Sequence, residues 1–163
     1  AKWFNAQYMH NLSDEALAVY MQPVLKAHGI EVSDAEAGKA AGIMKERASF
    51  ITDLWDLTSY FFVAPSQYEE KQMKKYWKGE NPARLAELRE VLSAIDDFSL
   101  ENTEAVVGAW IQEKGYGMGQ IMNTLRLALV GAGKGPGMYD VTAFIGKEEC
   151  LKRIDYILTN YSC

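Results

Sequence analysis

A helical segment, a glycine-rich break and a second helical segment near the end of the chain constrain the fold most strongly. Residues 131–137 hold four glycines and Pro136, a composition that stops helices and forms loops. Pro136 is expected to start the next helix and Gly146 to interrupt it. Apolar residues recur at helical spacing before the break and predict one buried face: Ile121, Leu125, Ala128 and Leu129.

The same spacing continues through the rest of the chain and predicts an all-α fold. Pro23 is expected to kink or split its helix, and residues 60–63 are expected to form a buried connector, with a strand as the alternative. Four serines are expected to cap helices through their side chains: Ser13, Ser33, Ser66 and Ser99. The expected helices span residues 14–28, 34–45, 50–58, 70–78, 82–95, 103–113, 121–129 and 147–160.

With 163 residues, the chain is long enough to bury a core in one or two small domains. We expect two consecutive helical bundle subdomains. The first covers residues 1–64 and the second residues 65–163, because a short apolar run ends in a turn at Ala64-Pro65. No internal repeat or low-complexity segment suggests another arrangement.

Composition excludes several classes of protein. No apolar run reaches the length of a membrane-spanning helix, and the beginning has no secretory signal pattern. Because the chain starts at Ala1 without methionine, it reads as a piece of a longer chain. Cys150 and Cys163 are too few for a disulfide framework and indicate a reducing, cytoplasmic context.

Catalytic and metal-binding chemistry is poorly supported. The chain has two histidines, His10 and His28, and no cluster with metal-ligand spacing. Cys150 has no nearby histidine in the sequence to activate it as a nucleophile. The carboxylate pairs at 96–97 and 148–149 are expected at helix ends, where solvated charge is the ordinary interpretation. We therefore expect no catalytic residue and no metal site.

Basic residues around the glycine-rich break favour the binding of a few nucleotides. The net charge of −5 argues against indiscriminate binding to nucleic acid. Between Arg126 and Arg153, however, five basic residues outnumber three acidic ones. An arginine can stack on a base and hydrogen-bond to it, and glycines let backbone groups approach. Arg126, Lys134 and the glycines are therefore candidate RNA-binding residues.

Two other interpretations of this break stay open. A nucleotide phosphate loop is disfavoured, because a helix precedes the break and Gly135 follows Lys134 where that motif requires serine or threonine. A helix–helix connector without a ligand is the interpretation that the pattern alone favours.

A second basic segment lies in the middle of the chain. It combines two aromatic residues, Tyr76 and Trp77, with four lysines: Lys71, Lys74, Lys75 and Lys78. A basic, aromatic helix can bind an RNA backbone. Because glutamates flank it, a solvated helix face is the favoured interpretation, and RNA binding is the alternative.

Three motifs near the break resemble the last segment of bacterial glutamyl-tRNA synthetases. They are Leu125-Arg126-x-Ala128-Leu129-x-Gly131, Gly135-Pro136-Gly137-Met138-Tyr139 and Gly146-Lys147-Glu148-Glu149. The family shows L-R-x-A-L-T-G, P-G-L-F and L-G-K-E at these places. The opening Lys2-Trp3-Phe4-Asn5-Ala6-Gln7-Tyr8 is similar to the family's K-x-x-W-x-N-x-x-Y stretch. The resemblance spans nearly the whole chain and implies the C-terminal, all-α anticodon-binding region of a class I aminoacyl-tRNA synthetase.

The resemblance also implies which residues hold the anticodon. In the family these are the arginine of the L-R-x-A-L motif and the P-G-L segment, which correspond to Arg126 and to Gly135, Pro136 and Met138. The family often has threonine where Val130 stands and a bulkier residue near Gly135. Backbone contacts at Gly135 are therefore expected, and side-chain contacts are not.

A second arginine of the family lies in the preceding subdomain, and its spacing before Phe61-Phe62 assigns it to Arg47. There it accompanies the choice of tRNA-Glu, with C as third anticodon base, over tRNA-Gln, with G. The alternative for Arg47 is an ion pair with Glu46 or Asp53. The first subdomain is expected to contact the tRNA stem and the anticodon, and the second to contact the anticodon.

The family's catalytic half lies outside this chain. Neither of its nucleotide-binding motifs occurs here, so this chain alone is expected to activate no amino acid and to need no cofactor. The parent would be an ATP-dependent glutamate–tRNA ligase that binds ATP and Mg in its catalytic half. The expected partners are tRNA-Glu and that half, without a membrane and with a monomeric protein. The alternatives are a helical protein–protein adaptor and a fragment of a non-discriminating Glu/Gln tRNA ligase.

Overall fold

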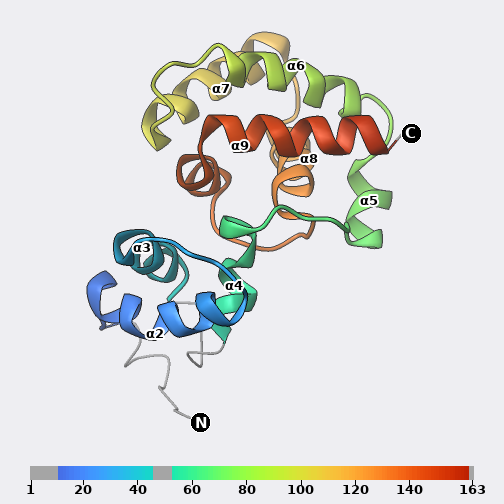
Figure 1. The fold of residues 1–163 in the computed structure, drawn as a ribbon. Coiled ribbons are helices and arrows are strands. Elements are labelled where there is room, and N and C mark those ends of the chain that lie inside the picture. The colour runs from blue at the N-terminus through green and yellow to red at the C-terminus, as the bar shows by residue number, and fades with distance from the viewer. Residues whose placement is uncertain (1–10, 46–52, 162–163) are drawn as a thin grey trace. The chain divides into compact units, whose positions relative to one another are not determined.

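The computed structural model describes residues 11–45 and 53–161, and this part of the chain consists of helices joined by loops (Figure 1). The prediction of an all-α fold is confirmed, because the described residues form helices and no strand. Contacts within the chain divide it into two compact units, Ala1–Val63 and Ala64–Cys163. Arg47 and the opening motif lie outside the described residues.

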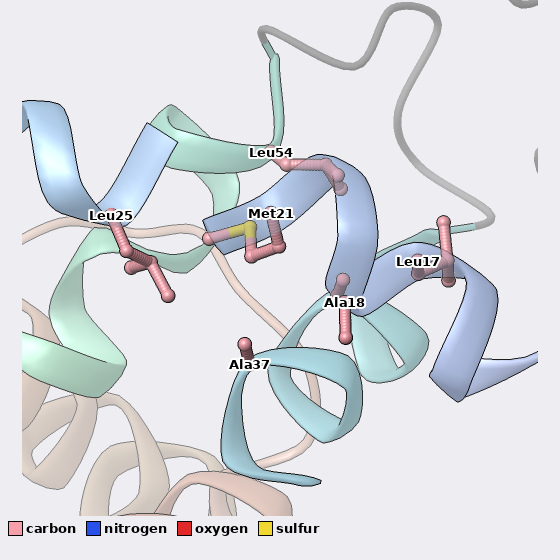
Figure 2. Packing of buried hydrophobic residues seen from close by; sticks show 7 residues of the cluster. Leu17, Ala18, Met21, Leu25, Ala37 and Leu54 are labelled. Atoms are coloured by element: carbon pink, nitrogen blue, oxygen red, sulfur yellow. The ribbon is translucent and has the colours of Figure 1, made fainter. Parts of the chain in front are cut away.

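The described part of the first unit contains α2 (Asp14–Ala27), α3 (Asp34–Met44) and α4 (Asp53–Phe62). Its core is a cluster of apolar side chains drawn from all three helices (Figure 2): Leu17, Ala18, Met21, Leu25, Ala37, Ala41 and Leu54. Small residues on α3 let it approach α2 closely. A Cβ on Gly38 would lie 2.3 Å from the carbonyl oxygen of Asp14, so this position requires glycine.

Caps define the beginnings of α2 and α3, as the sequence predicts. The hydroxyls of Ser13 and Ser33 each accept a hydrogen bond at 3.1 Å from a first-turn N–H. Of the kink or split expected at Pro23, the split does not occur, because α2 continues through the proline as one helix. The buried residues on both sides of the proline compensate for the hydrogen bond that it cannot donate: Leu17, Met21 and Leu25.

The prediction for residues 60–63 is also wrong. Tyr60, Phe61 and Phe62 continue α4 and form neither a connector nor a strand. Tyr60 and Phe61 are each only 4% exposed, since α4 packs against α2 and α3. Aromatic residues have a modest helix propensity, and the burial of their apolar area outweighs that local preference.

The described part of the second unit contains α5 (Glu70–Tyr76), α6 (Asn81–Ser93), α7 (Leu100–Lys114), α8 (Met118–Val130) and α9 (Met138–Asn160). Ser99 caps α7 as predicted, accepting from the N–H of Asn102 at 3.3 Å. α8 contacts each of the other four helices. Almost all of its second half is buried, so the position of its C-terminal end is fixed by the core.

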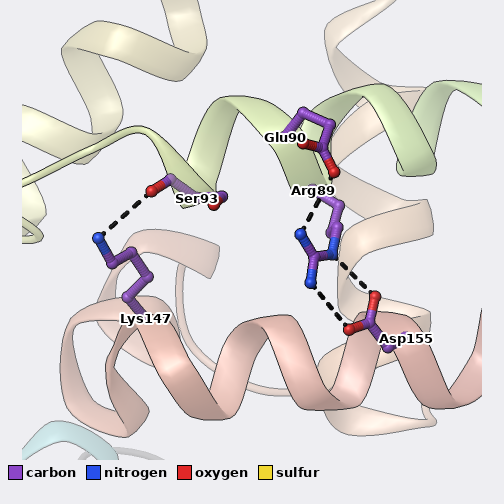
Figure 3. A network of polar contacts seen from close by, with 5 residues as sticks. All are labelled: Arg89, Glu90, Ser93, Lys147 and Asp155. Carbon is purple, nitrogen blue, oxygen red and sulfur yellow. Dashed lines mark hydrogen bonds and ion pairs between the residues drawn. The ribbon is translucent and has the colours of Figure 1, made fainter.

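α9 consists of two helical segments that meet at Gly146, whose backbone (φ 85°, ψ 164°) is not helical, as predicted. Directly after the break, Lys147 donates hydrogen bonds to two carbonyl oxygens at the end of α6, including that of Ser93 at 3.3 Å (Figure 3). Farther along, Arg89 of α6 binds both carboxylate oxygens of Asp155, at 2.8 and 3.0 Å. These contacts join α9 to α6, and the hydrogen bonds from Arg89 lower the pKa of Asp155.

Candidate nucleic-acid interface

The end of α8 determines where the glycine-rich loop begins. Gly131 has a left-handed backbone (φ 79°) and donates to the carbonyl oxygen of Leu127 at 2.9 Å. A side chain here would be strained by that conformation and blocked by its neighbours. Its Cβ would lie 2.8 Å from both the carbonyl oxygen of Gln67 and the Cβ of Pro65. The loop therefore starts in close contact with residues 65–67.

Glu69 anchors the loop through two hydrogen bonds. Its backbone N–H donates to the carbonyl oxygen of Gly131, and its carboxylate accepts from the N–H of Gly133, both at 2.8 Å. Glu69 occupies the N-cap position of α5 without capping it by its side chain. The expected cap at Ser66 is therefore wrong. Glu69 instead makes a contact 64 residues away in sequence, which a local capping pattern does not encode.

Arg126 lies over the loop from the last turn of α8. It is half-buried, and its Nη1 donates to the carbonyl oxygen of Lys134 at 3.0 Å. The guanidinium is thereby held beside the glycines at the surface of the unit. A planar group in this position can stack on a base and donate to its edge.

Arg153 of α9 supports the same helix end from the interior. Its side chain is 2% exposed, and its Nη1 donates to the carbonyl oxygen of Leu129 at 2.8 Å. Its Nε donates to Glu149 at 2.8 Å, so the buried charge is paired. The sequence interpretation of this pair was wrong. Arg153 does not contribute to a basic surface, and Glu149 is its ion-pair partner rather than a merely solvated helix-end charge.

The structure places the other predicted site residues on two sides of the loop. Lys134 is exposed, and Gly135 is partly exposed with a φ of 116°. Pro136 and Met138 are buried, Met138 being 3% exposed, so they support the loop from beneath and offer little surface to a base. α9 begins at Met138, two residues later than expected. Arg47 lies outside the described residues, and its contact stays a prediction.

A pocket of about 280 Å³ lies between residues 64–68, α8 and α9. Pro65, Tyr68, Arg153 and Tyr156 are among its lining residues. The hydroxyl of Tyr68 is buried without a hydrogen-bond partner, and burial raises its pKa to about 12. It therefore remains a neutral donor at physiological pH. Sequence patterns did not single out this pocket, because its walls come from three separate segments.

We next consider whether the described residues include a reactive cysteine or a cluster of metal-ligating side chains. Cys150 is fully buried, as its place in the helical pattern predicts, and burial raises the pKa of its thiol to about 12. No group of three or more histidine, cysteine or carboxylate side chains within residues 11–45 and 53–161 is placed to hold a metal ion. Among the same residues, no helix is long and apolar enough to cross a membrane.

The described residues form a helical fold with a glycine-rich loop beside Arg126, and comparison with known proteins identifies its class. The family described as "Anticodon binding domain" matches residues 12–158. This match covers most of the chain, so the chain belongs to the anticodon-binding domain family.

Its similar relatives are glutamate–tRNA ligases. The chain is 54% identical over 153 residues to that of Phocaeicola vulgatus and 50% identical over 152 residues to that of Bacteroides thetaiotaomicron. These alignments cover 94% and 93% of the chain and 30% of each relative. The crystal structure of a glutamate tRNA ligase from Elizabethkingia meningosepticum matches with a TM-score of 0.91 and 39% identity, over 97% of this chain and 31% of that one. The chain thus spans less than a third of its relatives' length, and the predicted resemblance is confirmed.

Proposed function

We propose that this chain recognises the anticodon of tRNA-Glu as the anticodon-binding region of a glutamate–tRNA ligase. The observation that carries the proposal is the position of Arg126, held over the glycine-rich loop by the carbonyl oxygen of Lys134. The loop adds backbone groups that glycines leave accessible. The family match and the glutamate–tRNA ligases among the relatives support the assignment of this surface to an anticodon.

Arg126 reads the edge of one anticodon base in this proposal. Its guanidinium offers five donors in one plane, of which Nη1 donates to the carbonyl oxygen of Lys134. Gly135 supplies backbone contacts, while Pro136 and Met138 keep the loop in shape from beneath. In this proposal Arg47 selects C over G at the third anticodon position, as its spacing before Phe61-Phe62 implies from the family resemblance.

The test is a titration of this chain with anticodon stem-loops that carry C or G at the third position. The unmodified chain is expected to prefer C. Arg126→Ala is expected to weaken binding by about 1–3 kcal/mol, the usual loss for a bidentate base contact. Arg126→Lys is the matched control. It keeps the charge but not the planar fork, so it should recover little of the loss.

The result also separates the alternatives. Equal binding to both stem-loops, lowered by Arg126→Ala, would indicate a ligase domain that does not discriminate between glutamate and glutamine tRNAs. Weak binding that responds neither to the base nor to Arg126→Ala would refute the proposal and favour a helical protein–protein adaptor. The two-base comparison with Arg47→Ala tests the assignment of Arg47 independently.

The same proposal covers the longer parent protein. We infer a monomeric, cytoplasmic ligase whose catalytic half binds ATP and Mg²⁺, outside this chain, and aminoacylates tRNA-Glu. This chain alone performs no amino acid activation. Its first unit contacts the tRNA stem and the anticodon, and its second unit presents Arg126 and the loop. The similarity to relatives that are about three times as long supports this arrangement.

A further inference from the structure

The lysines of α5 share one face of that helix. Lys71, Lys74 and Lys75 are related by three- and four-residue steps, which places them side by side on a helix. All three are exposed, as is Lys78 just beyond the helix end. The opposite face of α5 is directed into the unit and is formed by half-buried and buried residues: Met73, Tyr76 and Trp77. The structure thus presents a basic stripe on an acidic chain.

Nearby carboxylates offset the positive charge of some lysines in this stripe more than that of others. Glu69 is bound to the N–H of Gly133 in the loop. Glu70 pairs with Lys74 at 2.9 Å. Lys75 lies with its ammonium 5.3 Å from the ring centre of Tyr76, a contact that leaves its charge intact. Among the three lysines within α5, Lys74 is therefore the one with a described carboxylate partner, and the charges of Lys71 and Lys75 are not offset by a described ion pair.

The stripe adjoins the glycine-rich loop through Gln72. A Cβ on Gly133 would lie 2.6 Å from Nε2 of Gln72, so this side chain touches the loop. With 3.6 residues per turn, Lys75 lies about 60° and Lys71 about 100° around α5 from Gln72, whereas Lys74 lies about 160° away. Within the stripe, Lys75 is accordingly nearest to the loop, Lys71 comes next and Lys74 is farthest from it.

We propose that Lys71 and Lys75 bind phosphate groups of the RNA strand whose bases are read at the glycine-rich loop. This inference rests on the proposed anticodon recognition and names a second part of the same interface. Lysine ammonium groups suit phosphates because they are compact point charges. Phosphate contacts position a strand without reading its sequence. In this proposal the basic stripe binds the backbone of the strand, and the loop contacts its bases.

The test measures the salt dependence of anticodon stem-loop binding for the full chain and for Lys71→Ala/Lys75→Ala. Each lost phosphate contact lowers the slope of log affinity against log salt by about one. We expect the slope of the double variant to fall by about two, with the preference for C over G unchanged. Lys74→Ala is the matched control on the same helix and should change the slope by less than about half a unit, because Lys74 faces away from the loop and is paired with Glu70.

Thermal unfolding of each variant checks that the helix is intact, which is the result expected for alanine at exposed helical positions. An unchanged slope in Lys71→Ala/Lys75→Ala would overturn the proposal, and so would an equal fall in Lys74→Ala, which would indicate general charge attraction. Equal binding of the C and G stem-loops by the unmodified chain, unaffected by Arg126→Ala but with the lysine effect retained, would instead refute anticodon recognition. Absence of binding at any salt concentration would overturn both.

Discussion

Gly131→Ala tests whether the glycine-rich loop is held by contact with the segment before α5. Two costs apply at this position. An alanine with a φ of 79° costs about 1–2 kcal/mol relative to glycine, because its Cβ crowds the following carbonyl oxygen. The same Cβ would also lie 2.8 Å from Gln67 O and from Pro65 Cβ. Neither atom is the end of a flexible side chain, so the segment must shift, at about 1–3 kcal/mol as in overpacked cores.

Gly115→Ala separates the two costs. Gly115 also follows a helix in the second unit and has a φ of 71°, but a Cβ there would meet no atom within 4 Å. We expect Gly131→Ala to lower the free energy of unfolding by about 2–5 kcal/mol and Gly115→Ala by about 1–2 kcal/mol. Urea unfolding monitored by circular dichroism measures both. Equal losses in the two variants would refute the argument that the segment at 65–67 fixes the loop.

The remaining predictions concern the ion pairs of α9. Arg153→Ala should cost about 3–5 kcal/mol of unfolding free energy, because it removes a side chain that is 2% exposed, leaves the carbonyl oxygen of Leu129 without this donor and breaks the ion pair with Glu149; Arg153→Met with Glu149→Leu should recover part of that loss in the same urea assay. The pKa of Asp155 is lowered by its hydrogen bonds from Arg89, so its stabilising contribution is present above the unfolded pKa of about 4 and disappears as pH falls through the lower folded value. The stability difference between the unmodified chain and Asp155→Asn should accordingly shrink on acidification, and a difference independent of pH would contradict this role.

Local sequence patterns predicted the fold well where structure depends on neighbours along the chain. The caps at Ser13, Ser33 and Ser99 and the break at Gly146 each follow from a few adjacent residues. The predictions failed where distant contacts decide. Residues 60–62 are helical because their aromatic side chains are buried against other helices.

In the candidate site, too, the sequence predicts what depends on neighbouring residues and misses what depends on distant contacts. Arg126, Lys134 and the glycines could be proposed from the sequence because they are close together in it. Glu69 and Arg153 were missed as parts of the site, since their partners at Gly133 and Leu129 lie 64 and 24 residues away. Burial of Pro136 and Met138 also could not be predicted, because a motif shows which residues are present and not which side of a loop they occupy.

The carboxylate of Glu69 has a consequence for how a polynucleotide can lie on this surface. In a glycine-rich loop an available N–H attracts anions, but here the N–H of Gly133 is already bound to a negative group. A phosphate placed at that point would be repelled, whereas the uncharged edge of a base would not. In the proposed interface, Glu69 would therefore disfavour phosphate groups next to Gly133 and leave that place to the uncharged edge of a base.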